Sequence, residues 1–392
     1  MPKKIASVIV ATALLSIAGI ANAQDAKPRI ADIDWTEAGV IPVSGNAKER
    51  LQDVDATLLP VLVPKAFFDF KSLRFVGQPL EYAASVRATG AAMSVVGTRI
   101  AIDVEGDTVA AGPAAEIEIG EKSISASIKQ YGAAYVITIE CENAADPRCA
   151  KDSYVQDLLA GLELVGGGKG QPTTKPATTP ASSLIGVSAD PAFLYDPPGK
   201  LHGGGGAGAS STIIYAPNIR FPVEEKPAYL NSQVYGVGGY LGKYSPKSWK
   251  DRENYKYPWF DNFCETRSRR TPSCPGGTGH QGVDIRPALP SDRKYMAVAV
   301  EPGRIVKVGV YSVTLAGNSG NHYNYLHLEM AQLKVRRGDT VAEGQPIGLI
   351  SNDFGKVPTS VHLHFEIMQN VNGMGWRHVP PYSSLVAAYK AM

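Results

Sequence analysis

A segment rich in glycine, threonine and proline divides this chain of 392 residues. Residues 166–180 read GGGKGQPTTKPATTP and have no hydrophobic periodicity, which is typical of a flexible tether. A second glycine run follows at residues 203–208. Because a chain of this length exceeds the usual size of one domain, we expect two domains, at residues 24–165 and 213–392, joined by a linker at 166–212.

The first 23 residues have the three parts of a secretory signal peptide. Lys3 and Lys4 precede an apolar run from Ile5 to Ile20, and Ala21-Asn22-Ala23 forms a cleavage site of the A-x-A type. The run is shorter than the roughly 20 residues that span a bilayer, and no cysteine lies near it for lipid attachment. We therefore expect cleavage near Ala23, export, and a mature chain without an integral membrane segment.

The charge balance argues against one class of partner. The chain has 39 Lys and Arg against 37 Asp and Glu, and removal of Lys3 and Lys4 would leave 37 of each. Proteins that bind nucleic acid or an anionic membrane need a basic excess to displace counterions. We therefore expect neither of these as the main partner.

The four cysteines form two close pairs. Cys141 and Cys149 are eight residues apart, and Cys264 and Cys274 are ten residues apart. Four cysteines allow three connectivities, of which two local disulfides are the simplest. A zinc knuckle is disfavoured because its cysteines are two to four residues apart. Two disulfides, Cys141–Cys149 and Cys264–Cys274, are also typical of an exported protein.

Residues 24–165 contain segments in which apolar and polar residues alternate, as they do in half-buried strands. After Cys149, apolar residues at 155, 158, 159 and 162 follow helical spacing up to the glycines at 166–168. We therefore expect an α+β domain, which we interpret as a binding or positioning module, with a division or cell-wall protein as a possible partner. The expected strands are Leu80–Arg87, Ser94–Val104, Ser123–Gln130 and Ala133–Glu140.

Six of the seven histidines lie in the second domain, and four of the six belong to three short motifs. The motifs are His280-Gln281-Gly282-Val283-Asp284, Tyr325-Leu326-His327-Leu328 and His362-Leu363-His364-Phe365-Glu366. In a strand, side chains two residues apart share a face, so His362 and His364 project together. One such motif alone occurs by chance in many proteins. All three within residues 280–366 of an exported chain indicate a shared site.

Histidine and carboxylate side chains are the ligands of catalytic zinc, which keeps three protein ligands and an open position for water. Zinc lowers the pKa of that water to about 7 and polarises a carbonyl group. Hydrolysis of an amide also needs a base and a group that stabilises the tetrahedral oxyanion. Five residues therefore match five roles in a mononuclear zinc hydrolase, with one Zn²⁺ per chain. They are His280, Asp284, His327, His362 and His364.

The three motifs, in this order, resemble those of the lysostaphin/LytM-type zinc metalloendopeptidases, which cleave peptide bonds of bacterial peptidoglycan. The resemblance covers about residues 275–370 and extends more weakly back to 213. It implies that His280, Asp284 and His364 are zinc ligands. It also implies that His362 is the general base and that His327 helps to hold the tetrahedral intermediate. Together with the export signal, it implies a periplasmic enzyme acting on a stem peptide or cross-link, such as the D-alanyl to diaminopimelate bond.

The resemblance further implies a mostly antiparallel β domain with barrel-sandwich hairpins, one of them at residues 335–348. A lipoyl-type carrier is an alternative for that hairpin alone, but no lysine lies at its tip. Two other functions stay open. A non-catalytic LytM-type regulator would use the same fold to activate a cell-wall amidase. A zinc D,D-dipeptidase is disfavoured because the His and Asp ligands of that class are seven residues apart, whereas His280 and Asp284 are four residues apart.

Several residues near the motifs have less specific predictions. His322 would lie on the opposite strand face from the motif histidine that follows it, so we expect it at the surface. His202 lies in the glycine-rich linker, and we expect it to be solvated. Glu366 either orients a metal-bound imidazole or is a solvated strand residue. The Cys264–Cys274 loop directly precedes His280, and we expect it to form a wall or a lid of the site.

Overall fold

A computed structural model describes residues 26–392 of the chain, except 37, 39–49, 53, 104–114, 171, 173–191, 238–248, 356–357 and 372–374. The expected signal peptide at 1–23 and much of the expected linker lie outside the described residues. In the described parts of the chain, no helix is long and apolar enough to cross a membrane.

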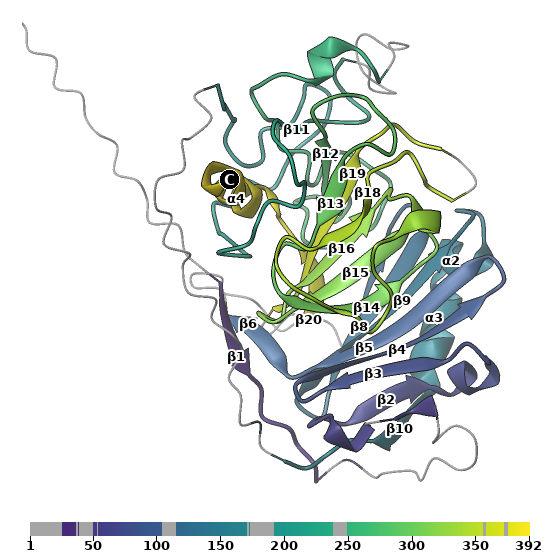
Figure 1. Cartoon of the computed structure of the whole chain (residues 1–392). Helices are drawn as coiled ribbons and strands as arrows, with labels where there is room; N and C mark the ends of the chain where they lie inside the picture. The colour runs from purple at the N-terminus through teal and green to yellow at the C-terminus, as the bar shows by residue number, and fades with distance from the viewer. Residues whose placement is uncertain are drawn as a thin grey trace, which may run out of the picture.

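The N-terminal half is built on a six-stranded antiparallel sheet of order β3-β4-β5-β9-β8-β7 (Figure 1). Strands β8 and β9 match two of the expected strands and form a hairpin, whose turn has Tyr131 and Gly132 at φ 53° and 83°. Two left-handed residues match the twist of a two-residue hairpin loop. The strands are β3 (Arg74–Gln78), β4 (Glu81–Ala88), β5 (Ala91–Thr98), β7 (Ala115–Ile119), β8 (Ser123–Gln130) and β9 (Ala133–Cys141).

The expected α+β class of this half is not confirmed, because its described part is β-rich. Its helices are short: 3-10 turns at Val54–Ala56 and Lys65–Asp69, α2 (Pro147–Ala150) and α3 (Asp152–Ala160). The predicted helix ends early because Gly161 caps it. Leu162, assigned above to the helical face, instead begins β10 (Leu162–Gly166), which pairs with β2 (Val61–Pro64).

The C-terminal half contributes most strands of a ten-stranded sheet with the path β1-β6-β19-β16-β15-β14-β17. Strands β11, β12 and β20 pair beside this path, and one bridge between β19 and β6 is parallel. The other pairings are antiparallel, as predicted. The strands are β1 (Lys27–Ile30), β6 (Ile100–Asp103), β11 (Tyr229–Leu230), β12 (Val283–Arg286), β14 (Gly303–Val308), β15 (Ser312–Gly317), β16 (His322–Leu326), β17 (Thr340–Val341), β19 (Leu363–Val371) and β20 (Gly375–Val379).

Shorter elements complete this half. Strands β13 (Met296–Val298) and β18 (Pro346–Leu349) form a separate pair, of which only β18 overlaps the hairpin predicted at residues 335–348. Helix α4 (Tyr382–Ala391) packs on the core through Leu385 and Tyr389, which are fully buried. Two 3-10 turns lie at Arg252–Asn254 and Met330–Gln332.

Strand β19 lies at the centre of the larger sheet, and all nine of its residues are buried. Leu363, Phe365 and Ile367 belong to the C-terminal core. Because side chains alternate along a strand, the residues between them, from His364 to Met368, point to the opposite face. On that face Met368 packs in a cluster that includes residues of both halves.

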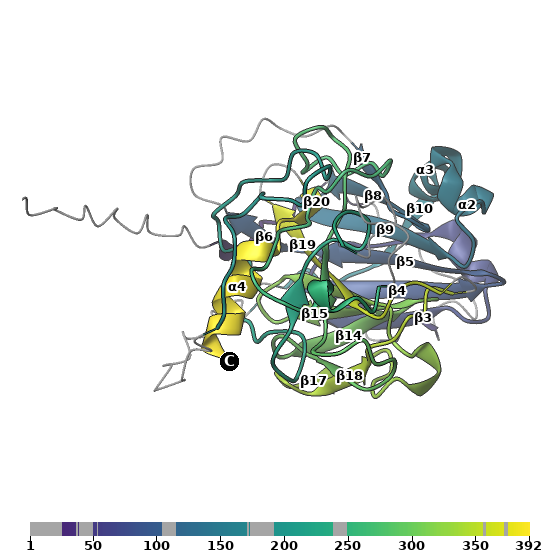
Figure 2. The ribbon, with the colours of Figure 1, turned by 90° about the horizontal axis from the view of Figure 1, so that it is seen from above.

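The two sheets therefore share a buried interface (Figures 1 and 2). On the N-terminal side its apolar residues come from β4, β5 and β9, and on the C-terminal side from β14, β15, β19 and β20. Strand β6 also leaves the N-terminal sheet after Arg99 and joins the larger sheet. The polar face of β19 thus points at the N-terminal half.

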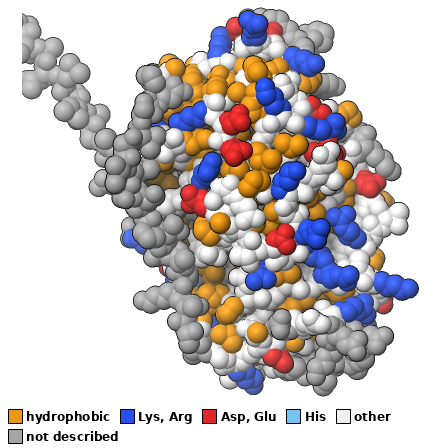
Figure 3. Space-filling view, viewed as in Figure 1, with side chains coloured by type: hydrophobic (Ala, Val, Ile, Leu, Met, Phe, Trp, Pro, Cys, Tyr) orange, Lys and Arg blue, Asp and Glu red, His pale blue; other side chains and the backbone are white. Residues whose placement is uncertain are grey.

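The charged side chains are unevenly distributed over the surface, although the net charge of the chain is near zero. On the face drawn in Figure 3, Lys and Arg side chains gather at the lower right, where Figure 1 shows β3 and β4. Burial, together with the charges of Arg74 and Arg87, lowers the pKa of Arg337 to about 10. Neutrality of the whole chain therefore coexists with a local basic patch.

Candidate metal centre

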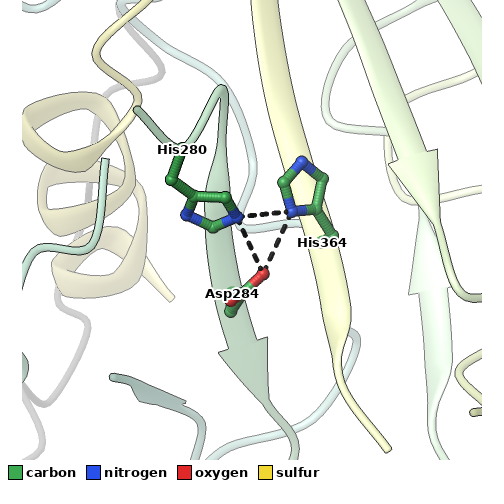
Figure 4. A group of neighbouring side chains, drawn as sticks. All are labelled: His280, Asp284 and His364. Atoms are coloured by element: carbon green, nitrogen blue, oxygen red, sulfur yellow. Dashed lines mark hydrogen bonds and ion pairs between the residues drawn. The ribbon is translucent and has the colours of Figure 1, made fainter. Parts of the chain in front are cut away.

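Three predicted ligands converge in the structure (Figure 4). Asp284 of β12 and His364 of β19 are directly paired across neighbouring strands, so their side chains share a face. The Asp284 Oδ1 atom lies 3.0 Å from His364 Nδ1 and 3.4 Å from His280 Nε2, and the two nitrogens are 3.0 Å apart. All three side chains are buried.

Outer hydrogen bonds determine which nitrogen of each imidazole faces this centre. His280 Nδ1 donates to the carbonyl oxygen of Asn262 at 2.8 Å. His364 Nε2 donates to Glu366 Oε1 at 2.9 Å. A neutral imidazole has a single N–H, so both inner nitrogens present lone pairs. When both imidazoles are neutral, three electron-rich atoms, the Asp284 oxygen included, therefore face one another without a hydrogen between them, an arrangement that a cation would stabilise.

The spacing of these three atoms fits a small tetrahedral ion. With metal–ligand bonds of about 2.0–2.1 Å, two ligand atoms in a tetrahedral zinc site are about 3.3–3.4 Å apart. The observed separations are 3.0 to 3.4 Å. Nitrogen and carboxylate donors also suit zinc. The three residues could therefore hold a metal ion with only small adjustments.

Two further imidazoles lie beside the three ligands. His362 directly precedes β19, and its Nε2 is 3.4 Å from Asp284 Oδ1. The centroids of the His327 and His362 rings are 4.5 Å apart. His362 Nδ1 donates to the carbonyl oxygen of Ser360 at 2.8 Å, and His327 Nδ1 to that of Asp353 at 3.0 Å. Each neutral ring thus keeps an Nε2 lone pair available.

Burial and neighbouring charges set the protonation of the centre. Burial lowers the pKa of His280 to about 4 and holds the pKa of His327 well below its usual value. Burial opposes ionisation of Asp284, but His280 and His362 hold its pKa well below the usual range. Burial likewise opposes the charged form of His364, but the adjoining carboxylates raise its pKa to about 9. At neutral pH and without a metal, the centre thus offers an ionised Asp284 carboxylate and neutral His280 and His327 imidazoles, whereas His364 carries a second proton with which a metal would compete.

These side chains line a pocket of about 270 Å³ with walls from three parts of the chain. Both predicted disulfides are present, and the Cys264–Cys274 loop contributes Arg267 and Arg269 to one wall. The N-terminal sheet contributes Glu121, whose carboxylate lies 2.6 Å from the Arg269 guanidinium. The segment before β19 contributes the third wall, including Phe354 and Thr359.

Two predictions for the remaining histidines are wrong. His322 is buried, not at the surface, because the N-terminal sheet covers its strand face, and its Nε2 lies 2.7 Å from Glu81 Oε2. His202 is not fully solvated, because its ring stacks on Phe260 with centroids 4.1 Å apart. Of the two roles considered for Glu366, its burial and its bond to a ligand imidazole favour orientation.

Asn262 is a site residue that no sequence motif indicated. Besides its carbonyl bond to His280, its side-chain Oδ1 accepts the Asp284 backbone N–H at 2.8 Å. It thus holds two of the predicted ligands from a loop about twenty residues upstream. Its position after Asp261 and before a buried Phe is unremarkable in sequence, so only the fold reveals it.

Residues 278–375 match the family model of peptidase family M23. The matched range contains all three motifs, and the resemblance to lysostaphin/LytM-type peptidases is confirmed over this segment. A search of curated proteins finds no match to the chain.

Solved structures give partial likenesses. The chain is similar to a candidate glycyl-glycine endopeptidase, LytM, of Ruminococcus gnavus, with 21% identity, 44% of this chain and 61% of that chain covered, and a TM-score of 0.30. The catalytic domain of the antimicrobial peptidase lysostaphin of Staphylococcus simulans is 28% identical, with 27% of this chain and 80% of that chain covered and a TM-score of 0.22. A zinc-containing peptidase of Vibrio cholerae is 27% identical, with 26% of this chain and 29% of that chain covered and a TM-score of 0.21. The chain thus spans less than two thirds of the Ruminococcus and Vibrio proteins.

Proposed function

We propose that this protein is a zinc-dependent endopeptidase that hydrolyses peptide bonds in bacterial peptidoglycan. The observation that carries the proposal is the convergence of His280, Asp284 and His364 beside the imidazoles of His327 and His362, because all five line one pocket and lie in the segment that matches peptidase family M23. A site that only bound a structural metal would have no need for the His327 and His362 imidazoles beside the three expected ligands. Hydrolysis uses both.

In this mechanism His280, Asp284 and His364 would hold one Zn²⁺, which would supply a Lewis acid and an acidified water. His362 accepts the proton of the attacking water at Nε2, because its Nδ1 proton is committed to the Ser360 carbonyl oxygen. That hydrogen bond also stabilises the imidazolium that forms. The same nitrogen then returns the proton to the leaving amine.

His327 has a different part in this mechanism. Its Nδ1 proton is held by the Asp353 carbonyl oxygen, so its neutral ring faces the pocket with an acceptor. Burial keeps its pKa low in the resting site, and negative charge developing on the substrate would raise that pKa. His327 therefore donates to the tetrahedral oxyanion only after it has taken a proton from solvent water, and it gives this proton back to solvent when the intermediate collapses. Its contribution is specific to the charged intermediate.

The walls of the pocket suit an acidic peptide. Arg267 and Arg269 line it, and each already binds one carboxylate, Glu265 at 2.7 Å and Glu121 at 2.6 Å. Peptidoglycan stem peptides carry carboxylates that could exchange with the half-exposed Glu121 on Arg269. This supports a cross-link such as D-alanyl to diaminopimelate as the bond cut.

The proposal extends to the location and layout of the protein. The signal peptide expected at 1–23 and the two disulfides support a periplasmic location for the mature enzyme, where thiols are oxidised. The peptidase domain is residues 213–392, and residues 24–165 are the module joined to it by the linker at 166–212.

The test is digestion of purified sacculi by the mature chain, followed by mass spectrometry of the released fragments. We expect soluble muropeptides with new peptide termini, and none from the His280→Ala variant. If the wild-type chain releases nothing but makes a separate amidase release stripped glycan, the protein is a regulator and the proposal is wrong.

A further inference from the structure

A chain of buried polar contacts leads from a metal ligand to the N-terminal sheet. His364 Nε2 donates to one oxygen of Glu366, and the other oxygen, Oε2, lies 3.2 Å from His378 Nε2. His378 Nδ1 in turn contacts Glu118 Oε2, and the His378 backbone N–H donates to Glu118 Oε1 at 3.4 Å. Glu118 belongs to β7 and His378 to β20. All four residues are less than a tenth exposed.

The carboxylate in the middle of this chain has one defined orientation. Asn324 of β16 is the cross-strand partner of Glu366, and its Nδ2 donates to Glu366 Oε2 at 2.7 Å. The Asn324 amide is itself oriented by Thr314, whose hydroxyl donates to its Oδ1 at 2.6 Å. Oε2 thus receives donors from Asn324 and His378, and Oε1 is left for His364. This arrangement directs the His364 Nδ1 lone pair towards the metal centre.

His378 can make both of its contacts only when both ring nitrogens carry protons. Each faces a carboxylate oxygen, which cannot donate when ionised. Burial opposes the charged imidazolium, but Glu118 and Glu366 together raise the pKa of His378 to about 10. Without Glu118, His378 would lose one of the two negative charges that stabilise its second proton. If neutral His378 turned the lone pair of its Nε2 towards Glu366, that lone pair and the Glu366 carboxylate would repel each other.

We propose that Glu118 and His378 are positioning residues of the metal site, through which the N-terminal sheet holds His364 in its metal-binding orientation. The inference rests on the proposed function, because it assumes that His364 binds zinc. It gives residues 24–165 a role in the site itself. The sheet that carries Glu118 completes the support of a ligand that lies on the other sheet.

The expected effect follows from what outer partners do at metal sites. A hydrogen-bonded partner of a metal-bound imidazole typically changes metal affinity about 10- to 100-fold when it is removed. Glu118 acts through His378 and Glu366, so we expect the Glu118→Gln variant to bind zinc about tenfold more weakly.

Glu116 provides a matched control. It lies two residues from Glu118 on the same strand and binds Arg377, the neighbour of His378, at 2.7 Å. Its pair also bridges the two sheets, but its carboxylate takes no part in the chain of contacts to His364. Glu116→Gln therefore removes an interdomain ion pair of the same kind without touching the proposed function of Glu118.

The experiment is a zinc titration of the mature chain in competition with a chromophoric chelator. We expect a dissociation constant about tenfold higher for Glu118→Gln and within about twofold of wild type for Glu116→Gln. Thermal unfolding of the zinc-free variants measures how far each destabilises the fold. Equal weakening by both variants, or an affinity of Glu118→Gln within about twofold of wild type, would overturn the inference.

A second variant keeps the test decisive. His378→Gln keeps one donor for Glu366 but cannot bridge both carboxylates, so we expect it to weaken zinc binding as well. If Glu118→Gln does not fold, His378→Gln replaces it in the test, and a zinc affinity of His378→Gln within about twofold of wild type would overturn the inference. A wild-type chain that binds no zinc would refute the proposed function itself, whereas tight wild-type binding with unaffected variants would refute only the positioning role.

Discussion

Each imidazole of the metal centre is oriented by a partner outside the three motifs or at their edge. Backbone carbonyl oxygens of Asn262, Ser360 and Asp353 hold His280, His362 and His327 in one tautomer. The motifs predict which residue types gather, because their chemistry requires histidine and carboxylate. They do not predict the tautomers, since those depend on carbonyl groups that any residue supplies.

At the residue scale, His362→Ala and His327→Ala should each reduce kcat without loss of the metal. Removing a general acid or base costs about 10²- to 10⁴-fold in rate. Neither residue is among the three ligands, so zinc content should stay at the wild-type level. His202→Ala is the control, because His202 stacks on Phe260 and does not line the pocket. Steady-state kinetics on a defined cross-linked muropeptide measures the effect, and rates within about tenfold of wild type for both variants would contradict these roles.

At the scale of elements, the sequence predicted the strands with strict alternation and placed other boundaries less well. The H-L-H-F-E motif indicated β19 because its apolar and polar residues alternate. The strand expected at 94–104 divides at Arg99, whose guanidinium binds the carbonyl oxygens of Ala31 and Leu58. Such long-range contacts leave no local pattern. The helix predicted after Cys149 extended too far, because Leu162 fits the apolar pattern of a helix and of a strand equally well.

The loop between Cys264 and Cys274 gives a prediction for a single element. It forms one wall of the pocket, and Cys264 N donates to the His280 carbonyl oxygen at 2.9 Å. Changing both cysteines to serine should loosen Arg267 and Arg269 but leave the three ligands in place. We expect unchanged zinc content and a KM raised by a few-fold, at about 2–3 kcal/mol lower stability. Unchanged kinetics would show that the disulfide has no part in shaping the groove.

At the scale of the whole molecule, the sequence predicted two regions but not their contact. Ala83 and Val136 of the N-terminal sheet pack with Met368 and Trp376 of the larger sheet, far apart in the chain. His322 and His378 are buried for the same reason, since carboxylates of the N-terminal sheet cover them. Composition and periodicity report on single elements, so they could not show that one sheet completes the polar surroundings of another.

This interface gives a pH dependence of stability. The pKa of His378 is raised from 6.5 to about 10 by Glu118 of β7 and Glu366 of β19, against the effect of burial. Its contribution to stability is therefore fully present below pH 6.5 and is lost as the pH rises through about 10.

We expect the unfolding free energy of the zinc-free protein to fall between these pH values more steeply than that of His378→Gln. Urea unfolding at a series of pH values, with a chelator present, measures the difference. Parallel profiles for the two proteins would contradict the assignment.

We propose above that this chain holds a catalytic zinc at His280, Asp284 and His364. The most direct measurement is the zinc content of the purified mature chain by plasma mass spectrometry after dialysis against metal-free buffer. We predict about one zinc per chain for the wild type and for His202→Ala, and almost none for His280→Ala. A wild-type chain without zinc, or a His280→Ala variant that retains it, would contradict the account.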